Sequence, residues 1–262
     1  MVWYKDIFSK QTIARYKKNL SFVGKISNEL RDLDVYLLKK TEYKAMLPAV
    51  LRDDIDPLFE YLGKRRALSF RKAIRILNSK KYKRVMQEWE SFLNEPQYDL
   101  ISGPSGKAPV YELASTRIYK QYRNVVKAGN RILENCEDEK LHELRIQCKK
   151  LRYLIQFFAN LFSQKKISIL VGQLKKLQDV LGDYNDLSVQ ANYLFESAKD
   201  MPSNLARLNK TLLVIGSLIG ELETKRQSVK ESFSETFTRF ASRQNQQLFQ
   251  DVFVLQPKKV VQ

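Results

Sequence analysis

Apolar residues recur every three or four positions along most of the chain, which is the period of an amphipathic helix. The segment 138–162 shows the pattern best. With about 100° of rotation per residue, one side of this segment gathers Leu144, Cys148, Leu151, Leu154, Ile155 and Phe158. Similar periodicity predicts helices over 4–40, 56–78, 80–93, 112–133, 167–181 and 204–243. The sequence therefore predicts an all-α protein built as a helical bundle.

Several helix ends carry characteristic residues. Asp56 followed by Pro57 is typical of a helix start, because Asp caps free N–H groups and Pro fits the first turn. Gly182 is expected to end the helix 167–181 as a left-handed cap. Residues 95–111 concentrate Pro and Gly and are interpreted as a linker. The linker is not a phosphate-binding P-loop, because Ala108 stands where that motif needs Ser or Thr.

The chain contains an internal repeat at an offset of 154 residues, at which Arg31-Asp32-Leu33 corresponds to Asn185-Asp186-Leu187. The repeat predicts one domain over 1–262, with a first half over about 1–94, the linker over about 95–111 and a second half over about 112–255. Asp32 and Asp186 are expected to be structural, as caps or as partners of basic residues. The counterpart of His142 would precede residue 1, so our hypothesis is that the chain lacks the first half's basic helix.

A row of cationic residues runs along the side of segment 138–162 opposite its apolar side. It consists of His142, Arg145, Lys149 and Arg152, with Tyr153 beside them and no acid among them. A solvated helix usually mixes opposite charges at this spacing, because they stabilise each other there. The row therefore indicates an anionic ligand. A plain solvated face is the alternative.

Two further sets of cations are candidates for the same ligand. On the helix 112–133, Arg117, Lys120, Arg123 and Lys127 form a second, largely one-sided row. In an antiparallel hairpin of this helix with the next one, the two rows would face one groove. On the helix 56–78, we expect the opposite wall of the groove to be completed by Arg65, Arg66, Arg71 and Lys72.

Composition supports an anionic partner. Lys and Arg number 46 against 29 Asp and Glu, which gives a formal net charge of +17. The cysteines Cys136 and Cys148 form no disulfide framework, so a reducing compartment is expected. The longest apolar run, 212–219, is too short to span a bilayer, and the first ten residues lack an apolar signal core. We therefore expect a soluble, cytoplasmic protein that does not bind membranes.

Most familiar catalytic arrangements are missing from the sequence. The chain has one histidine, so metal sites with several His ligands are excluded. There is no Gly-x-Ser-x-Gly motif, and His142 and Cys148 face different sides of one helix. Asp183 and Asp186 are interpreted as helix-start residues rather than metal ligands. We expect a binding protein without enzymatic activity, cofactor or metal.

Among polyanions, a polymer of phosphates without bases suits the cationic rows best. Duplex DNA would favour amide side chains that read base edges, and single-stranded nucleic acid would favour exposed aromatic residues that stack bases. Arg can bind phosphoryl oxygens through two hydrogen bonds, Lys adds a point charge, and His142 adds sensitivity to pH. The alternative for His142 is a hydrogen bond to a carboxylate such as Asp186 or Glu139.

Two stretches carry a family resemblance. The run LHELRIQCKKLRYLIQFF at 141–158, followed by LKKLQDVLGDYNDLSV at 174–189, closely resembles the second half of the CHAD domain (conserved histidine α-helical domain). ELRDLDVYLLKK at 29–40 resembles the first-half signature of the same family. The resemblance implies a helical bundle that binds inorganic polyphosphate along a basic groove. Its motif covers the row at 142–153, whereas the other cations are inferred from spacing.

Two alternatives remain open at this level. One is a helical protein that binds RNA or DNA, for which nucleic acid would be more than a competing polyanion. The other is an accessory domain of an enzyme that handles polyphosphate, with such enzymes as protein partners. A polyphosphate ligand would also imply association with polyphosphate granules.

Overall fold

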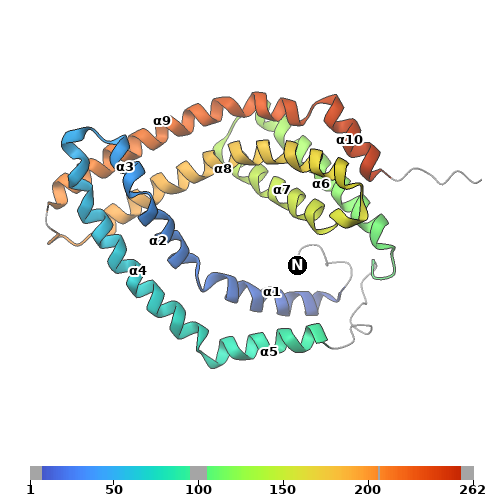
Figure 1. The fold of residues 1–262 in the computed structure, drawn as a ribbon, viewed down its shortest axis with the longest axis horizontal. Coiled ribbons are helices and arrows are strands. Elements are labelled where there is room, and N and C mark those ends of the chain that lie inside the picture. The colour runs from blue at the N-terminus through green and yellow to red at the C-terminus, as the bar shows by residue number, and fades with distance from the viewer. Residues whose placement is uncertain (1–7, 95–104, 206, 255–262) are drawn as a thin grey trace, which may run out of the picture. The chain divides into compact units, whose positions relative to one another are not determined.

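The computed structural model describes residues 8–94, 105–205 and 207–254. Throughout these residues the regular structure is helical, and no strand occurs among them (Figure 1). This confirms the expected all-α class. Residues 1–7 and most of the linker fall outside the described residues, so the structure does not address the hypothesis that the chain lacks the first half's basic helix.

The helices follow the predicted periodicity, with shorter pieces at the N-terminal end. The first elements are α1 (Lys10–Lys25), α2 (Asn28–Leu38), α3 (Lys40–Met46), the 3₁₀ helix η2 (Ala49–Ile55), α4 (Asp56–Leu77) and α5 (Lys80–Asn94). They are followed by α6 (Val110–Glu134), α7 (Asp138–Phe157), the 3₁₀ helix η4 (Ala159–Leu161), α8 (Gln164–Asp200), α9 (Leu208–Phe240) and α10 (Arg243–Phe253).

Gly182 does not end a helix, so the expected cap is wrong. Helix α8 continues through this residue to Asp200, and no described glycine has a positive φ. A single Gly inside a helix costs only about 1 kcal/mol relative to Ala. The buried leucines of α8, which include Leu174, Leu177 and Leu181 before the glycine and Leu194 after it, hold the helix together across that weak point.

The chain folds into two compact units that both include parts of α8 and α9. Unit 1 comprises residues 1–107 and 194–219, and unit 2 comprises residues 108–193 and 220–262. Residues 194–219 belong to the second half of the sequence but to unit 1. A division of the chain at the linker alone therefore does not describe the compact units.

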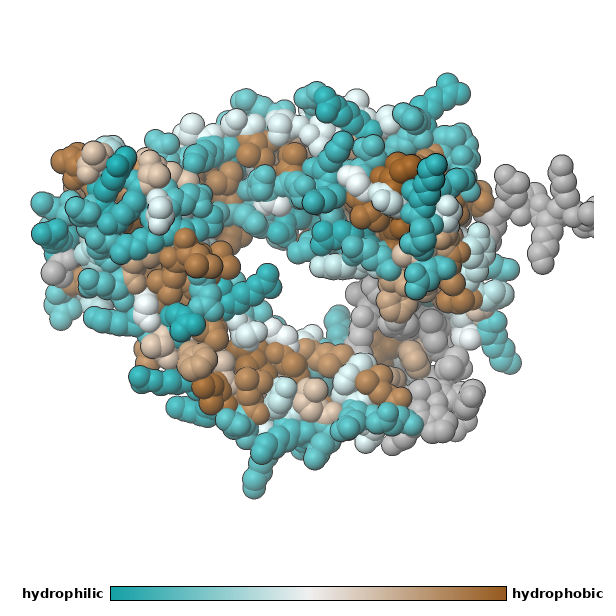
Figure 2. Space-filling view, viewed as in Figure 1, coloured by the Kyte–Doolittle hydropathy of each residue, from teal (hydrophilic) through white to brown (hydrophobic). Residues whose placement is uncertain are grey.

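In unit 1, α2 packs on α4 and α1 packs on α5. Leu33, Leu58 and Leu62 are fully buried at the first of these contacts. Tyr16 of α1 lies 4.3 Å from the half-buried Phe92 of α5, ring centre to ring centre, so aromatic contacts join these two helices. Apolar residues also reach the surface along α4 and α5 (Figure 2), among them Leu68, Phe70, Ile74, Leu77, Met86 and Leu93.

In unit 2, α6 packs on α7 and on α10. The ring of Tyr122 on α6 stacks on Phe249 of α10, with ring centres 3.8 Å apart. On α9, Phe237 lies against Gly129 of α6 so closely that a Cβ atom on the glycine would be 1.9 Å from the ring. Phe233, Phe237 and Phe240 of α9 are buried. These contacts fix α6, α9 and α10 around one core.

Candidate polyanion-binding site

The cationic row of α7 lies opposite the face that the helix buries. Leu144, Cys148 and Leu151 are fully buried, and the cationic residues follow the other side of the helix. His142 is exposed, whereas Arg145, Lys149 and Arg152 are half-buried and Tyr153 is exposed. The predicted separation of an apolar and a cationic side on one helix is therefore present in the fold.

His142 is held by an amide and not by the carboxylate that the sequence suggested as its alternative partner. Its Nδ1 lies 2.7 Å from Oδ1 of Asn185 on α8. The Nδ2 of Asn185 donates to Asp186, so the amide oxygen is the atom that faces the imidazole. Because an amide oxygen only accepts, Nδ1 of His142 is the donor. The Nε2 atom is therefore the one that remains for a ligand.

Arg145 forms an ion pair with α8. Its Nη2 lies 3.3 Å from Oδ1 of Asp186, and the Asp186 side chain is 62% exposed. Asp186 stands in the middle of α8, so of its two expected structural roles the structure shows pairing with a basic residue rather than capping. The ion pair and the His142 hydrogen bond together turn the cationic row toward α8.

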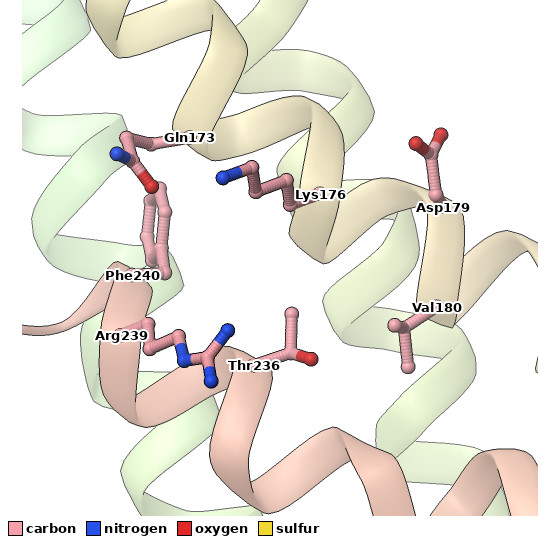
Figure 3. Close-up of a pocket in the computed structure, with 7 residues that line it drawn as sticks. All are labelled: Gln173, Lys176, Asp179, Val180, Thr236, Arg239 and Phe240. Carbon is pink, nitrogen blue, oxygen red and sulfur yellow. The ribbon is translucent and has the colours of Figure 1, made fainter.

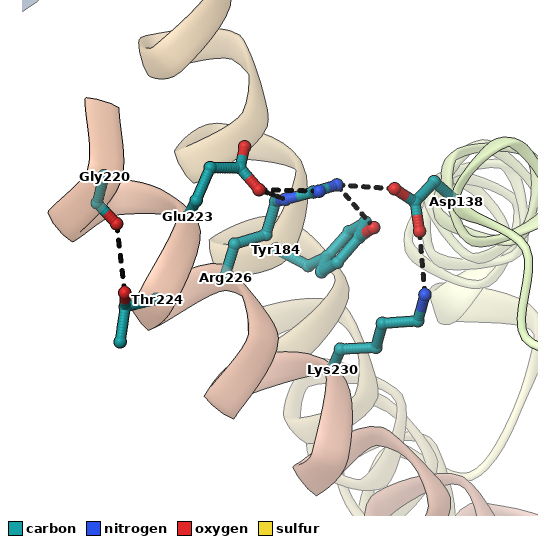
Figure 4. Close-up of polar contacts among 7 residues, drawn as sticks. All are labelled: Asp138, Tyr184, Gly220, Glu223, Thr224, Arg226 and Lys230. Atoms are coloured by element: carbon teal, nitrogen blue, oxygen red, sulfur yellow. Dashed lines mark hydrogen bonds and ion pairs between the residues drawn. The ribbon is translucent and has the colours of Figure 1, made fainter. Parts of the chain in front are cut away.

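A second cluster ties the start of α7 to α8 and α9 (Figure 4). Asp138 accepts from Lys230 at 2.9 Å and from Arg226 at 2.6 Å, and Arg226 also donates to the Tyr184 hydroxyl at 2.8 Å. The hydrogen bond from Lys230 is the main cause that holds the pKa of Asp138 well below its usual range. Arg226 also pairs with Glu223. The cluster anchors the helix that carries the cationic row.

Sequence reasoning missed Arg226 and Lys230 as neighbours of the row. A signal was present, because the two cations are four residues apart on α9 and so share one face of that helix. What the sequence lacked was their contact with Asp138, which is about 90 residues away in the chain. Such a contact follows only from the packing of α9 on α7.

The rows of α6 and α7 do not face one groove within unit 2, which corrects the expectation from the hairpin. Gln121 of α6 donates to the carbonyl oxygen and to the side-chain oxygen of Gln147 on α7, at 3.1 and 2.7 Å. Gln147 lies about 160° around α7 from Arg145, because two residues correspond to about 200° of rotation. The side of α7 that meets α6 is thus not the side that carries the cations.

The cations of α6 have two different surroundings. Arg123 and Lys127 line a cavity together with Ala241 and Gln246 at the junction of α9 and α10. Arg117 is half-buried and Lys120 is exposed. The α6 row is therefore split, with one pair directed to the α9–α10 junction.

The candidate cations of α4 belong to unit 1 and are largely paired there. Arg65 lies 3.5 Å and Lys72 3.8 Å from carboxylate oxygens of Glu29 on α2. Arg66 pairs with Asp34 at 2.5 Å. Arg71 is exposed on α4, and Asp32 is exposed on α2 beside these pairs. The acids of α2 therefore offset part of the charge of this cluster.

A small cavity of about 300 Å³ between α8 and α9 has mixed charge (Figure 3). Lys176 and Arg239 line it together with the carboxylate of Asp179. Arg239 also pairs with Glu235. The acids close to both cations make this cavity a weak candidate for an anion.

Other chemistry is sparse in the part of the chain that the structure describes. Burial raises the pKa of the Cys148 thiol, and burial is also the largest cause of a raised pKa at Cys136. Among the described residues, no cluster of three or more His, Cys, Asp or Glu side chains could hold a metal ion. None of the described helices is both long and apolar enough to cross a membrane.

The model of the CHAD domain matches residues 2–194, so the chain belongs to the CHAD family, a family associated with polyphosphate binding. The matched region contains the cationic row of α7 and its partners on α8.

Curated relatives include Uncharacterized protein MT2285 of Mycobacterium tuberculosis strain CDC 1551 and Uncharacterized protein Rv2226 of strain H37Rv. Each is 25% identical over 159 residues, which are 60% of this chain and 29% of the relative. The chain thus aligns with less than a third of the length of these proteins.

Proposed function

We propose that this chain binds inorganic polyphosphate through the cationic row of α7, without catalysing a reaction. The observation that carries the proposal is the charge balance on this side of α7. Two acids on this side are already paired, Asp138 with two cationic partners and Asp186 with one. Lys149 and Arg152 form no ion pair among the described residues, so an anionic polymer would find an excess of donors there.

Binding requires little rearrangement of the row. The pair between Arg145 and Asp186 is partly exposed, and such pairs contribute only about 0–1 kcal/mol. A phosphoryl group can therefore replace the carboxylate of Asp186 at low cost, and it offers Arg145 two parallel hydrogen bonds. Because Nδ1 of His142 is hydrogen-bonded to Asn185, the Nε2 atom would be the one that meets the ligand. Nε2 can donate a hydrogen bond to the ligand only in the imidazolium form.

Arg152 is suited to the far end of this row. Its guanidinium lies 5.4 Å from the ring centre of Tyr153, and its buried Nε has no hydrogen-bond partner in the described structure. The buried stem and the planar head favour a fixed position, so less side-chain entropy is lost when phosphate binds. The regular spacing of about 5 Å per helical turn then suits a linear ligand along α7.

The absence of catalysis is part of the proposal and rests on the side chains available. The single histidine of the chain is exposed, and its Nδ1 is hydrogen-bonded to an amide oxygen rather than to a carboxylate that would orient it as a catalytic base. Cys148 is buried, and its raised pKa opposes the thiolate that a nucleophile requires.

A competition experiment tests the proposed ligand. The bound probe is long-chain polyphosphate that carries a fluorophore, and the competitors are unlabelled polyphosphate and single-stranded RNA at equal phosphate concentration. The salt concentration is held fixed, because salt alone weakens either complex. Polyphosphate should displace the probe much better than RNA. Equal displacement would favour the alternative of a nucleic-acid-binding protein.

A matched pair of variants tests the site. Arg145→Glu with Lys149→Glu should weaken polyphosphate binding by about 10- to 100-fold, because two charge-assisted contacts become repulsive. The control, Lys165→Glu with Lys166→Glu, makes the same charge change at exposed residues of the first turn of α8. Equal losses in the two variants would mean that net charge, and not this row, decides binding. Circular dichroism would verify helicity in both.

The length of the curated relatives favours a second candidate, which is an accessory module of a larger polyphosphate-handling protein. More than two thirds of each relative lies outside the matched region. This candidate predicts that the isolated chain binds polyphosphate but that its effect on turnover is seen only with a polyphosphate-handling enzyme present.

A further inference from the structure

A second cationic site lies on α6, away from the row of α7. A cavity of about 430 Å³ opens between α6 and the junction of α9 with α10. Arg123, Lys127 and Arg131 line it from one helix, and Gln246 lines it from α10. Arg131 was not among the residues that the sequence pattern singled out, since the one-sided row considered there ended at Lys127.

Three cations line this cavity against a single carboxylate, that of Glu134. Within the part of the chain that the structure describes, Arg123, Lys127 and Arg131 form no ion pair, although Arg145 on α7 does. They are spaced four residues apart, and each like-charge pair at this spacing destabilises a helix by roughly 0.2–0.5 kcal/mol. The helix dipole offsets this like-charge repulsion for Arg131, which lies in the last turn of α6. It does not offset the repulsion for Arg123 and Lys127, which lie nearer the middle of the helix. An anionic ligand would offset it for all three.

Neutral donors complete the lining. The amides of Asn130 and Gln246 border the cavity, and so does Tyr119. The Tyr119 hydroxyl accepts a hydrogen bond from Gln250 at 3.4 Å, which leaves its own proton to donate to a ligand. Burial raises the pKa of the neighbouring Tyr122 to about 12, so this side chain adds no negative charge near neutral pH.

The boundaries of the cavity limit the length of the ligand. Its cations extend over about 12 Å of helix, because eight residues rise by 1.5 Å each. Glu134 lines the end beyond Arg131, and its carboxylate would repel a polyanion that continued past that point. Ala241 and Gln246 form the wall opposite α6. These limits suit a compact anion better than a long polymer.

We propose that this cavity is a separate binding site for a short phosphoryl anion, with two or three linked phosphoryl groups, held by Arg123, Lys127 and Arg131. The chemistry is shared by free pyrophosphate or tripolyphosphate and by the phosphates of a nucleotide. The site does not depend on the proposed binding of long polyphosphate by α7.

Isothermal titration with pyrophosphate and tripolyphosphate, at fixed ionic strength and with the full chain, tests the proposal. We expect one site per chain in addition to any weaker binding. Lys127→Gln with Arg131→Gln should weaken it by about tenfold or more, because two charge-assisted contacts are lost. Lys165→Gln with Lys166→Gln removes the same charge from α8 outside the cavity and should change the affinity less than twofold. Equal weakening by both pairs, or no saturable binding to the wild type, would overturn the proposal.

Three further measurements complete the test. Glu134→Gln removes a repulsive carboxylate without removing a cation, so it should tighten pyrophosphate binding. Weaker binding by this variant would contradict the proposed site, and this result does not depend on whether the double variant folds. If ATP binds no better than tripolyphosphate, the ligand of the site is an inorganic anion. If ATP binds much more tightly than tripolyphosphate, the ligand is a nucleotide. Either result supports the site. The variant Arg145→Glu with Lys149→Glu should still bind pyrophosphate, which separates this site from the one on α7.

Discussion

Replacing Gly129 by Ala tests the closest helix contact of unit 2. The added Cβ atom would lie 1.9 Å from Cε2 and 2.2 Å from Cζ of Phe237, far inside van der Waals contact. The Phe237 ring cannot move toward solvent, because the side chain is fully buried and stacks on Phe233 with ring centres 5.6 Å apart. The substitution must therefore push α6 and α9 apart or force the ring out of its preferred rotamer.

The expected cost follows from two opposing effects. Overpacking of a core by a methyl group typically costs about 1–3 kcal/mol. Ala in place of Gly inside a helix contributes up to about 1 kcal/mol in the opposite sense. For Gly129→Ala we expect the free energy of unfolding to fall by about 1–2 kcal/mol, since the overpacking outweighs the gain in helix propensity. In a chain of this size that lowers Tm by roughly 2–8 °C.

Gly182→Ala is the matched control, because it makes the same chemical change at a helical glycine with open space around it. No atom lies within 4 Å of its added Cβ. This variant should be more stable than the wild type by about 0.5–1 kcal/mol. Thermal unfolding followed by circular dichroism measures both variants. A Gly129→Ala variant as stable as the wild type would contradict the close contact with Phe237. A destabilised Gly182→Ala variant would contradict the helical conformation of Gly182, because Ala is disfavoured only in a left-handed cap.

Two further predictions concern the Asp138 cluster and the cysteines. Asp138→Asn should reduce stability at neutral pH, because the lowered pKa of Asp138 means that folding favours its ionised form. This contribution is present above the unfolded-state pKa of about 4 and is lost as the pH falls below it, so denaturant curves of wild type and variant should converge in acid. Convergence at alkaline pH instead would refute the assigned sign. A thiol reagent should label Cys136, which is half-buried, before Cys148, which is inaccessible until the chain unfolds. Equal labelling rates under native conditions would contradict the burial of Cys148.

Helical periodicity predicted the buried face of α7 well because that face depends on one helix alone. The apolar positions of α7 were assigned from spacing, and Leu144, Leu151 and Leu154 are buried as expected. A helix start at Asp56 and Pro57 was predicted correctly, but Asp56 does not cap it, because Asp56 is the first residue of α4 and its carboxylate pairs with Lys40 and Lys44. Gly182 was misassigned because the stability of α8 at that point comes from leucines on both sides of it, which outweigh a local preference.

The candidate site was predicted only in part. The α7 row was recognisable from the sequence, since its residues share one helix. Its hydrogen bond to Asn185 was not, because the neighbouring Asp186 was an equally good partner by spacing. Nor was the separation of Arg123 and Lys127 from the α7 row. That separation depends on the side of α7 that meets α6, which a helical pattern does not specify.

The sequence by itself determined that the chain is helical, which residues α7 buries, where the α7 cations lie and to which family the motif belongs. These properties are encoded within single helices, by side-chain spacing. Only the tertiary structure decided which helix each cation faces. A rotation of one helix against its neighbours changes those contacts while it leaves the local periodicity intact, so the partners of Arg145, Asp138 and Lys127 became visible only in the packed fold.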